Sequence, residues 1–122
     1  MSQWTHVAGC IRVDSVRIIN DPINDIKKVL GKIVRYGDSD WDTTIPCGSE
    51  GSLEYQIIEN PDKNCMAAYC IPIWGDLRDY SNVEEIENWF NSCCENLIVR
   101  NAVLNIDVEF GIEKNISYKP HY

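Results

Sequence analysis

The order in which two hydrophobic periods alternate along this chain constrains its fold more than any other feature. In residues 4–13 apolar and polar side chains alternate, which is the pattern of a half-buried strand. An Asp-Pro pair then precedes apolar residues at helical spacing, which predicts a helix over residues 22–35 that stops at Gly37. The chain is therefore predicted to begin with a strand and a helix.

A hairpin and a second helix are predicted next. Residues 53–58 alternate, residues 60–64 carry dense turn chemistry, and a return strand is expected over residues 65–74. Pro72 has no backbone N–H, so it marks an edge, a bulge or the end of that strand. Ser81 and Glu84 form a capping box ahead of apolar residues spaced by three and four, which predicts a helix from there to Leu97.

The last strand is predicted over residues 102–110. Its even-numbered positions are apolar and are expected to be buried: Ala102, Leu104, Ile106, Val108 and Phe110. The odd-numbered positions form a wet face. Residues 113–122 show no period and are expected to be loosely held.

This element order predicts an α+β fold in one domain, residues 1–122. The expected arrangement is ferredoxin-like, βαββαβ, with a four-stranded antiparallel sheet and two helices on one face. In that topology the start of the first strand, the end of the last, and the segments 45–52 and 74–80 all lie at the same end of the sheet. Trp4 and His6 are therefore expected to neighbour both segments.

Charge excludes some classes of partner. The chain has 19 acidic and 11 basic residues and a formal charge of −8, which repels nucleic-acid backbones and anionic lipid. An open sheet face like that of RNA-recognition modules would here carry Glu54, Gln56, Asp107 and Glu109, so RNA binding is disfavoured. No apolar run approaches the length of a membrane span. A basic protein surface is the natural counterpart.

The cysteines indicate free thiols. Six are present, but the N-terminus lacks the pattern of a signal peptide, which favours a reducing cytosol. Cys10 and Cys93 are interpreted as small hydrophobic residues. Cys65 and Cys70 are four residues apart with no second pair at matching spacing, and only two histidines exist, so neither a metal nor a cofactor is expected.

Two segments rich in glycine and acids, residues 45–52 and 74–80, are the candidate functional surface. Glycine N–H groups in a nest, with an arginine nearby, would suit a phosphate; these ligand residues would be Gly48, Ser49, Gly51 and Arg78. The segment leads into a strand, whereas phosphate loops open a helix, so a tight turn is the favoured interpretation. Asp76, Arg78 and Asp79 equally suit mutual pairing before the helix.

Catalytic alternatives are weaker. A hydrolase would need Glu50 to be paired with Asp76 or Asp79 in different environments. A Cys47 nucleophile would need His6 as its base. Residues 9–17, G-C-I-R-V-D-S-V-R, faintly resemble the phosphate loop of acylphosphatases but lack that family's inner glycine. No catalytic residue is therefore assigned.

Several motifs together are similar to small acidic phage proteins of low-GC Gram-positive bacteria: W-T-H-V-A-G, P-C-G-S-E-G-S, G-D-L-R-D-Y and an acidic closing strand. That resemblance implies an inhibitor of host defence, such as an anti-CRISPR protein, in the host cytoplasm.

The leading hypothesis is a non-enzymatic inhibitor that binds a basic, nucleic-acid-binding surface of a defence nuclease such as a CRISPR effector. A nucleotide-signal sponge, a weak hydrolase and homodimerisation through edge strands stay open. The expected partner-binding residues are Trp4, His6, Ser49, Glu50, Tyr55, Trp74, Asp76, Arg78, Asp79 and Tyr80.

Overall fold

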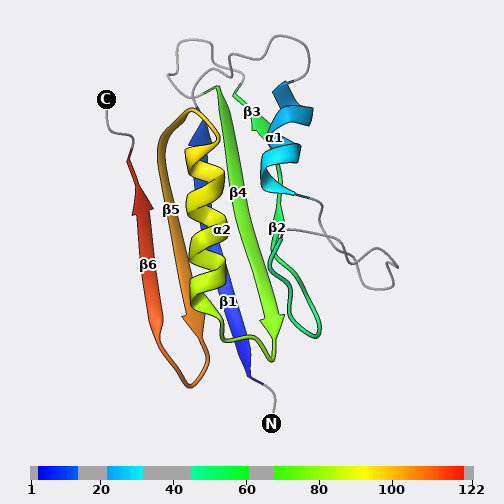
Figure 1. Ribbon diagram of the computed structural model, residues 1–122, viewed down its shortest axis with the longest axis vertical. Helices are drawn as coiled ribbons and strands as arrows, with labels where there is room; N and C mark the ends of the chain where they lie inside the picture. The colour runs from blue at the N-terminus through cyan, green and yellow to red at the C-terminus, as the bar shows by residue number, and fades with distance from the viewer. Residues whose placement is uncertain (1–2, 14–21, 32–44, 61–67, 120–122) are drawn as a thin grey trace.

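A computed structural model describes residues 3–13, 22–31, 45–60 and 68–119 (Figure 1). They form one antiparallel sheet of six strands with two helices, so the predicted α+β class is confirmed. The strand order is β2-β4-β1-β5-β6, and β3 also pairs with β4. The elements are β1 (Trp4–Val13), α1 (Pro22–Leu30), β2 (Glu54–Tyr55), β3 (Ile58–Glu59), β4 (Tyr69–Arg78), α2 (Val83–Glu95), β5 (Val99–Val108) and β6 (Glu113–Tyr118).

The sheet is not the clean four-stranded ferredoxin-like sheet that was predicted, and one reason is Pro72. The second predicted strand is split into β2 and β3, both of which pair with β4. Between them the Gln56 N–H donates to the Pro72 carbonyl at 3.3 Å. Because a proline cannot return a hydrogen bond, the ladder is interrupted at that point. Pro72 thus lies inside β4, opposite Cys10 of β1.

The other reason is β6. The prediction that residues 113–122 are loosely held is wrong for residues 113–118, which pair with β5 from Asp107↔Glu113 to Ala102↔Tyr118. The prediction that Phe110 is buried is also wrong: it lies in the turn between the two strands, 86 % exposed and with φ of 59°. An edge strand carries few apolar residues, so its alternation is weak in the sequence.

The strand β4 ends four residues later than predicted. Residues 74–78 were expected to be a loop, but they continue β4 and pair with β1 as far as Trp4↔Arg78. Gly75 and Asp76 had indicated a loop because both types are rare in strands. Asp76 tolerates a strand here because its side chain is exposed.

Both helices differ from the prediction at their ends. The helix α1 ends at Leu30, not at residue 35, because Gly31 takes a φ of 103° and its N–H closes the last turn on the Lys27 carbonyl at 2.8 Å. The N-cap of α2 lies one residue after Ser81, which was the predicted N-cap. It is Asn82, which accepts a hydrogen bond from the Glu85 N–H at 3.2 Å.

One face of the sheet and the two helices enclose the core. The Trp89 indole N–H donates to the Leu30 carbonyl at 3.0 Å, so α2 and α1 lie side by side on that face (Figure 1). The predicted apolar faces of β1, α2 and β5 are largely buried, with Gly9, Val83 and Leu97 half-buried and Phe110 exposed. The largest fully buried side chains include Phe90, Ile11, Ile26, Leu30, Leu53, Ile71, Ile86, Leu104 and Ile106.

We call the opposite side of the sheet the helix-free face. Cys10 lies on it, half-buried and outside the core, whereas Cys93 is buried, as the interpretation of Cys93 as a small hydrophobic residue predicts. Three large apolar side chains on this face are exposed by 42–52 %: Trp74, Ile58 and Val103. Toward one end of the sheet this face carries the charged residues Asp76 and Asp107 beside His6, and that end carries the candidate site.

Candidate functional site

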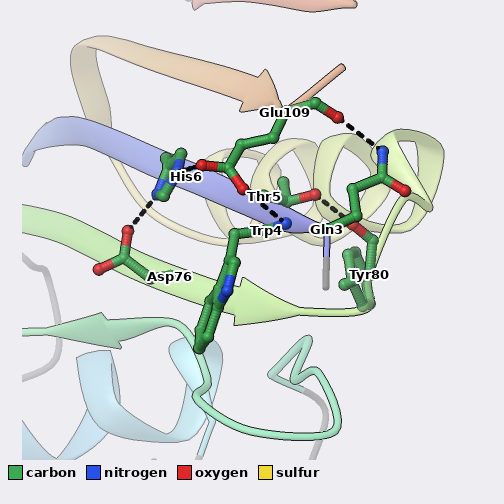
Figure 2. Close-up of polar contacts among 7 residues, drawn as sticks. All are labelled: Gln3, Trp4, Thr5, His6, Asp76, Tyr80 and Glu109. Atoms are coloured by element: carbon green, nitrogen blue, oxygen red, sulfur yellow. Dashed lines mark hydrogen bonds and ion pairs between the residues drawn. The ribbon is translucent and has the colours of Figure 1, made fainter. Parts of the chain in front are cut away.

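The start of β1, the end of β4 and the end of β5 are held together by backbone hydrogen bonds. The Asp79 N–H donates to the Gln3 carbonyl at 2.6 Å, and the Glu109 N–H donates to the Trp4 carbonyl at 2.9 Å. The Gln3 side-chain amide donates to the Glu109 carbonyl at 2.8 Å (Figure 2). The predicted meeting of these chain segments at one end of the sheet is therefore confirmed.

Residues 45–52 are attached to the same end. The Ser49 N–H donates to the Arg78 carbonyl and the Arg78 N–H to the Glu50 carbonyl, both at 3.0 Å. A single bridge between Cys47 and Ser52 closes the loop. The loop thus continues the edge of β4 beyond β2, and both candidate segments belong to one surface.

Glycine in this loop serves close packing and turn geometry. Gly51 has a φ of 77°, and a Cβ there would stand 2.1 Å from the Asp76 carbonyl oxygen. The N–H groups of Gly48 and Ser49 donate to carbonyls of Gly51 and Arg78. These two donors therefore do not point into an open anion nest, which agrees with the tight-turn interpretation.

Arg78 is engaged by acids. Its guanidinium lies 2.6 Å from a Glu50 carboxylate oxygen and 3.8 Å from one of Asp79. The predicted pairing is thus seen between Arg78 and Asp79, with Glu50 added, whereas Asp76 contacts His6. A nucleotide site at Gly48, Ser49, Gly51 and Arg78 would need these contacts to be released, so the sponge hypothesis gains no support from the geometry.

His6 lies between two carboxylates on the helix-free face (Figure 2). Its Nδ1 is 2.5 Å from Asp76 Oδ1, and its Nε2 is 3.1 Å from Glu109 Oε2. Carboxylates accept hydrogen bonds, so both ring nitrogens donate only when the imidazole is protonated. Asp76 first, and then Glu109, therefore raise the pKa of His6, and partial burial opposes them. We call these three residues the histidine clamp.

Glu109 was not among the predicted site residues. Its second carboxylate oxygen accepts the Trp4 N–H at 3.1 Å, and the His6 contact lowers the pKa of Glu109. Thr5 pairs with Val108, which places the next residue beside the start of β1. The sequence predicts that the first and last strands lie together at this end. If the end of β5 had also been predicted correctly, Glu109 would have been expected beside the start of β1.

Two predicted contact residues lie elsewhere. Tyr55 packs against the core, and its hydroxyl donates to the Gly31 carbonyl at 2.7 Å. Tyr80 also packs against the core, where burial raises its pKa, and its carbonyl accepts a hydrogen bond from Thr5 Oγ1 (Figure 2). Tyr80 therefore helps to hold the start of β1, Tyr55 contacts the residue after α1, and both side chains are partly buried.

Some residues of the catalytic alternatives contact other partners in the described part of the chain. Cys47 needed His6 as a base, but the His6 ring is held by Asp76 and Glu109. Glu50 pairs with Arg78, so it does not form a carboxylate pair with Asp76. For the acylphosphatase-like segment, residues 9–13 form part of β1, and residues 14–17, including Arg17, lie outside the described residues.

Acids predominate among the side chains of the strands and the 45–52 loop at this end, while Phe110 and Ile112 are exposed in the turn after β5. The register places Trp74 beside Glu54, Asp76 beside His6, and Asp107 between His6 and Glu113. Glu50 and Asp79 are exposed in the adjoining loop and turn. We call the following group, together with the exposed Trp74, the acidic face: Glu50, Glu54, Asp76, Asp79, Asp107, Glu109 and Glu113.

Comparisons with known proteins add no assignment. No family model, no curated protein and no solved structure matches the chain. In the described part of the chain, neither helix has the length and apolar character needed to cross a bilayer. The same residues contain no group of three or more His, Cys, Asp or Glu side chains arranged to hold a metal ion.

Proposed function

We propose that this protein is a non-enzymatic inhibitor that binds a basic, normally nucleic-acid-binding surface of another protein through the acidic face. The observation that carries the proposal is that seven carboxylates and the exposed Trp74 lie on the strands, loop and turns toward one end of the sheet, on the side that neither described helix covers. Its nearest cations are already engaged: Arg78 by Glu50 and Asp79, and His6 by the histidine clamp.

Charged and apolar residues of the acidic face would have different roles in binding. Long-range attraction between opposite charges speeds the encounter, and it weakens as salt is added. Trp74, 42 % exposed on β4, offers the apolar contact area that interface centres use. The Trp4 ring extends across β4 in the same region (Figure 2). Ser49 and the other loop groups would form the polar rim.

The phage resemblance supplies the setting for this proposal. A phage protein that blocks a nucleic-acid-binding surface would disable a defence nuclease, for example a CRISPR effector, in the cytoplasm of the host. The acidic face would then occupy positions where phosphates normally bind. Nothing in this mechanism requires a cofactor or a catalytic residue.

The test is a charge-reversal pair with a matched control. Asp76→Lys with Asp107→Lys removes acids from the acidic face, whereas Glu59→Lys with Glu95→Lys changes the net charge equally at exposed sites on β3 and α2. Tagged chain is used to purify partners from lysate of a bacterial host, followed by elution with heparin and measurement of affinity for the isolated partner.

We expect the acidic-face variant to bind at least about tenfold more weakly, and the control to stay within about twofold. Affinity should fall as salt is added, and nucleic acid should compete. Recovery of no nucleic-acid-binding partner, or equal weakening in both variants, would overturn the proposal.

A further inference from the structure

Two cysteines on the helix-free face lie unusually close together. Cys10 is on β1 opposite Pro72, and Cys70 is on β4 opposite Arg12, so the two are diagonal neighbours on adjacent strands. Their Sγ atoms are 3.0 Å apart. A disulfide bond needs about 2.05 Å, which leaves roughly 1 Å of approach for two rotatable side chains. Both residues are free thiols.

The pair is also reachable from solvent. Both side chains are half-buried on the side of the sheet opposite the two described helices. By contrast, Cys93 and Cys94 belong to α2 and are each only 1 % exposed. Cys47, in the 45–52 loop, is as open as the pair but makes no thiol–thiol contact within the described residues. The chain thus contains its own controls for access and for proximity.

We infer that Cys10 and Cys70 form a modification site, a dithiol that closes into an intramolecular disulfide by exchange with a small disulfide such as glutathione disulfide. This site is independent of the proposed partner, because it requires only the two strands as they pair here.

The exchange has two balanced steps. The thiolate of one cysteine attacks a sulfur of glutathione disulfide, which forms a mixed disulfide and releases one glutathione thiolate. The second cysteine then attacks the protein sulfur of that mixed disulfide and releases the second glutathione. Two cysteine thiols are oxidised, one glutathione disulfide is reduced to two glutathione molecules, and the two cysteine protons pass to them.

Proximity decides which product accumulates. The second sulfur lies beside the first, so disulfide closure is intramolecular. It should therefore be faster than reaction of the second cysteine with another glutathione disulfide. Burial first, and then the hydrogen bond between Cys10 and Cys70, raise the pKa of Cys10 to about 11, which keeps the thiolate scarce at neutral pH. Closure should therefore accelerate as pH rises.

The experiment treats the folded full chain with excess glutathione disulfide, blocks the remaining thiols with an alkylating agent and maps the products by mass spectrometry. Digestion with chymotrypsin, which cleaves after Tyr69, separates Cys65 from Cys70. We expect a crosslinked Cys10–Cys70 peptide two hydrogens lighter than its parts, glutathione on Cys47, and free Cys93 and Cys94. Dithiothreitol should reverse the crosslink.

Two variants sharpen the test. Cys10→Ser and Cys70→Ser should each lose the crosslink and carry glutathione, or a free thiol, at the remaining cysteine. Separate glutathione adducts on Cys10 and Cys70 of the wild type, a crosslink from either one to another cysteine, or two unreacted thiols under conditions that fully modify Cys47 would each overturn the inference. The wild-type map decides even if a variant does not fold.

Discussion

The two faces of the sheet are built from alternate residues of the same strands, yet they are held together by different forces. The helix-covered face is a closely packed apolar layer in which Ile11, Ile71 and Leu104 are 0–1 % exposed. On the helix-free face, directional contacts such as the histidine clamp organise charged side chains. Packing stabilises in proportion to buried area, whereas the polar contacts depend on strand register.

The largest effect is expected from truncation of the core. Phe90→Ala removes the largest fully buried side chain and should reduce the free energy of unfolding by about 3–5 kcal/mol. Trp74→Ala on the helix-free face removes an even larger ring, but it should cost less than about 1 kcal/mol because Trp74 is 42 % exposed. Urea unfolding followed by circular dichroism measures both. Equal losses would mean that the two faces do not differ as described.

A smaller effect is expected at the loop that carries part of the acidic face. Gly51→Ala would place a Cβ against the Asp76 carbonyl at a φ of 77°, so the loop should shift or strain. We expect a loss of about 1–3 kcal/mol in the free energy of unfolding. Ser49→Ala, at an exposed position in the same loop, should change it by less than about 1 kcal/mol. Unfolding curves that match for the two variants would show that the close approach is not required.

The same contrast explains what the sequence could predict. The apolar faces of β1, α2 and β5 were predictable because burial follows from residue type and period, whatever the partner. The topology also brought Trp4, His6 and both candidate segments to one end correctly. The second edge strand was missed because only Ile116 and Tyr118 of β6 are apolar and half-buried. The fold class therefore followed from local patterns, whereas the number of strands did not.

The contacts on the helix-free face were harder to predict from the sequence, because they depend on the register in which the strands pair. His6 meets Asp76 only since β1 and β4 pair with these residues directly opposite, and β4 extends four residues beyond its predicted end. Glu109 contacts His6 from the turn after β5. That turn was mispredicted, because the strand was expected to continue to Phe110. No pattern in the sequence places Cys10 beside Cys70. Pairwise geometry of this kind is set by the whole sheet.

The histidine clamp can be tested by titration. Asp76→Asn should lower the pKa of His6 toward 6.5, and Glu109→Gln should lower it less, because the Asp76 hydrogen bond is the larger cause of the raised pKa. NMR titration of the imidazole signals measures this, with His121→Gln used to assign the second histidine. Asp107→Asn is the control, since Asp107 faces His6 on β5 without being one of the two hydrogen-bond partners of its ring. A larger decrease with Asp107→Asn would contradict the clamp.

The smallest effect expected is on stability as a function of pH. The folded-state pKa of His6 is raised, so the stability it contributes is complete below pH 6.5 and is lost as pH rises through the folded-state value. The pKa of Glu109 is lowered, so its contribution is present above pH 4.5 and is lost as pH falls through its folded-state value. The difference in unfolding free energy between wild type and His6→Gln should therefore be largest between these two pH values.

That difference should also decrease with added salt, because the His6 side chain is 42 % exposed and Asp76 is 67 % exposed. Urea unfolding of both proteins across the pH range measures it, and Phe90→Ala should show no such maximum because its loss comes from packing. A difference that grows as pH rises would mean that neutral His6 is the stabilised form. The helix-free face would then be organised by something other than the clamp, since two carboxylates cannot both accept hydrogen bonds from a neutral imidazole.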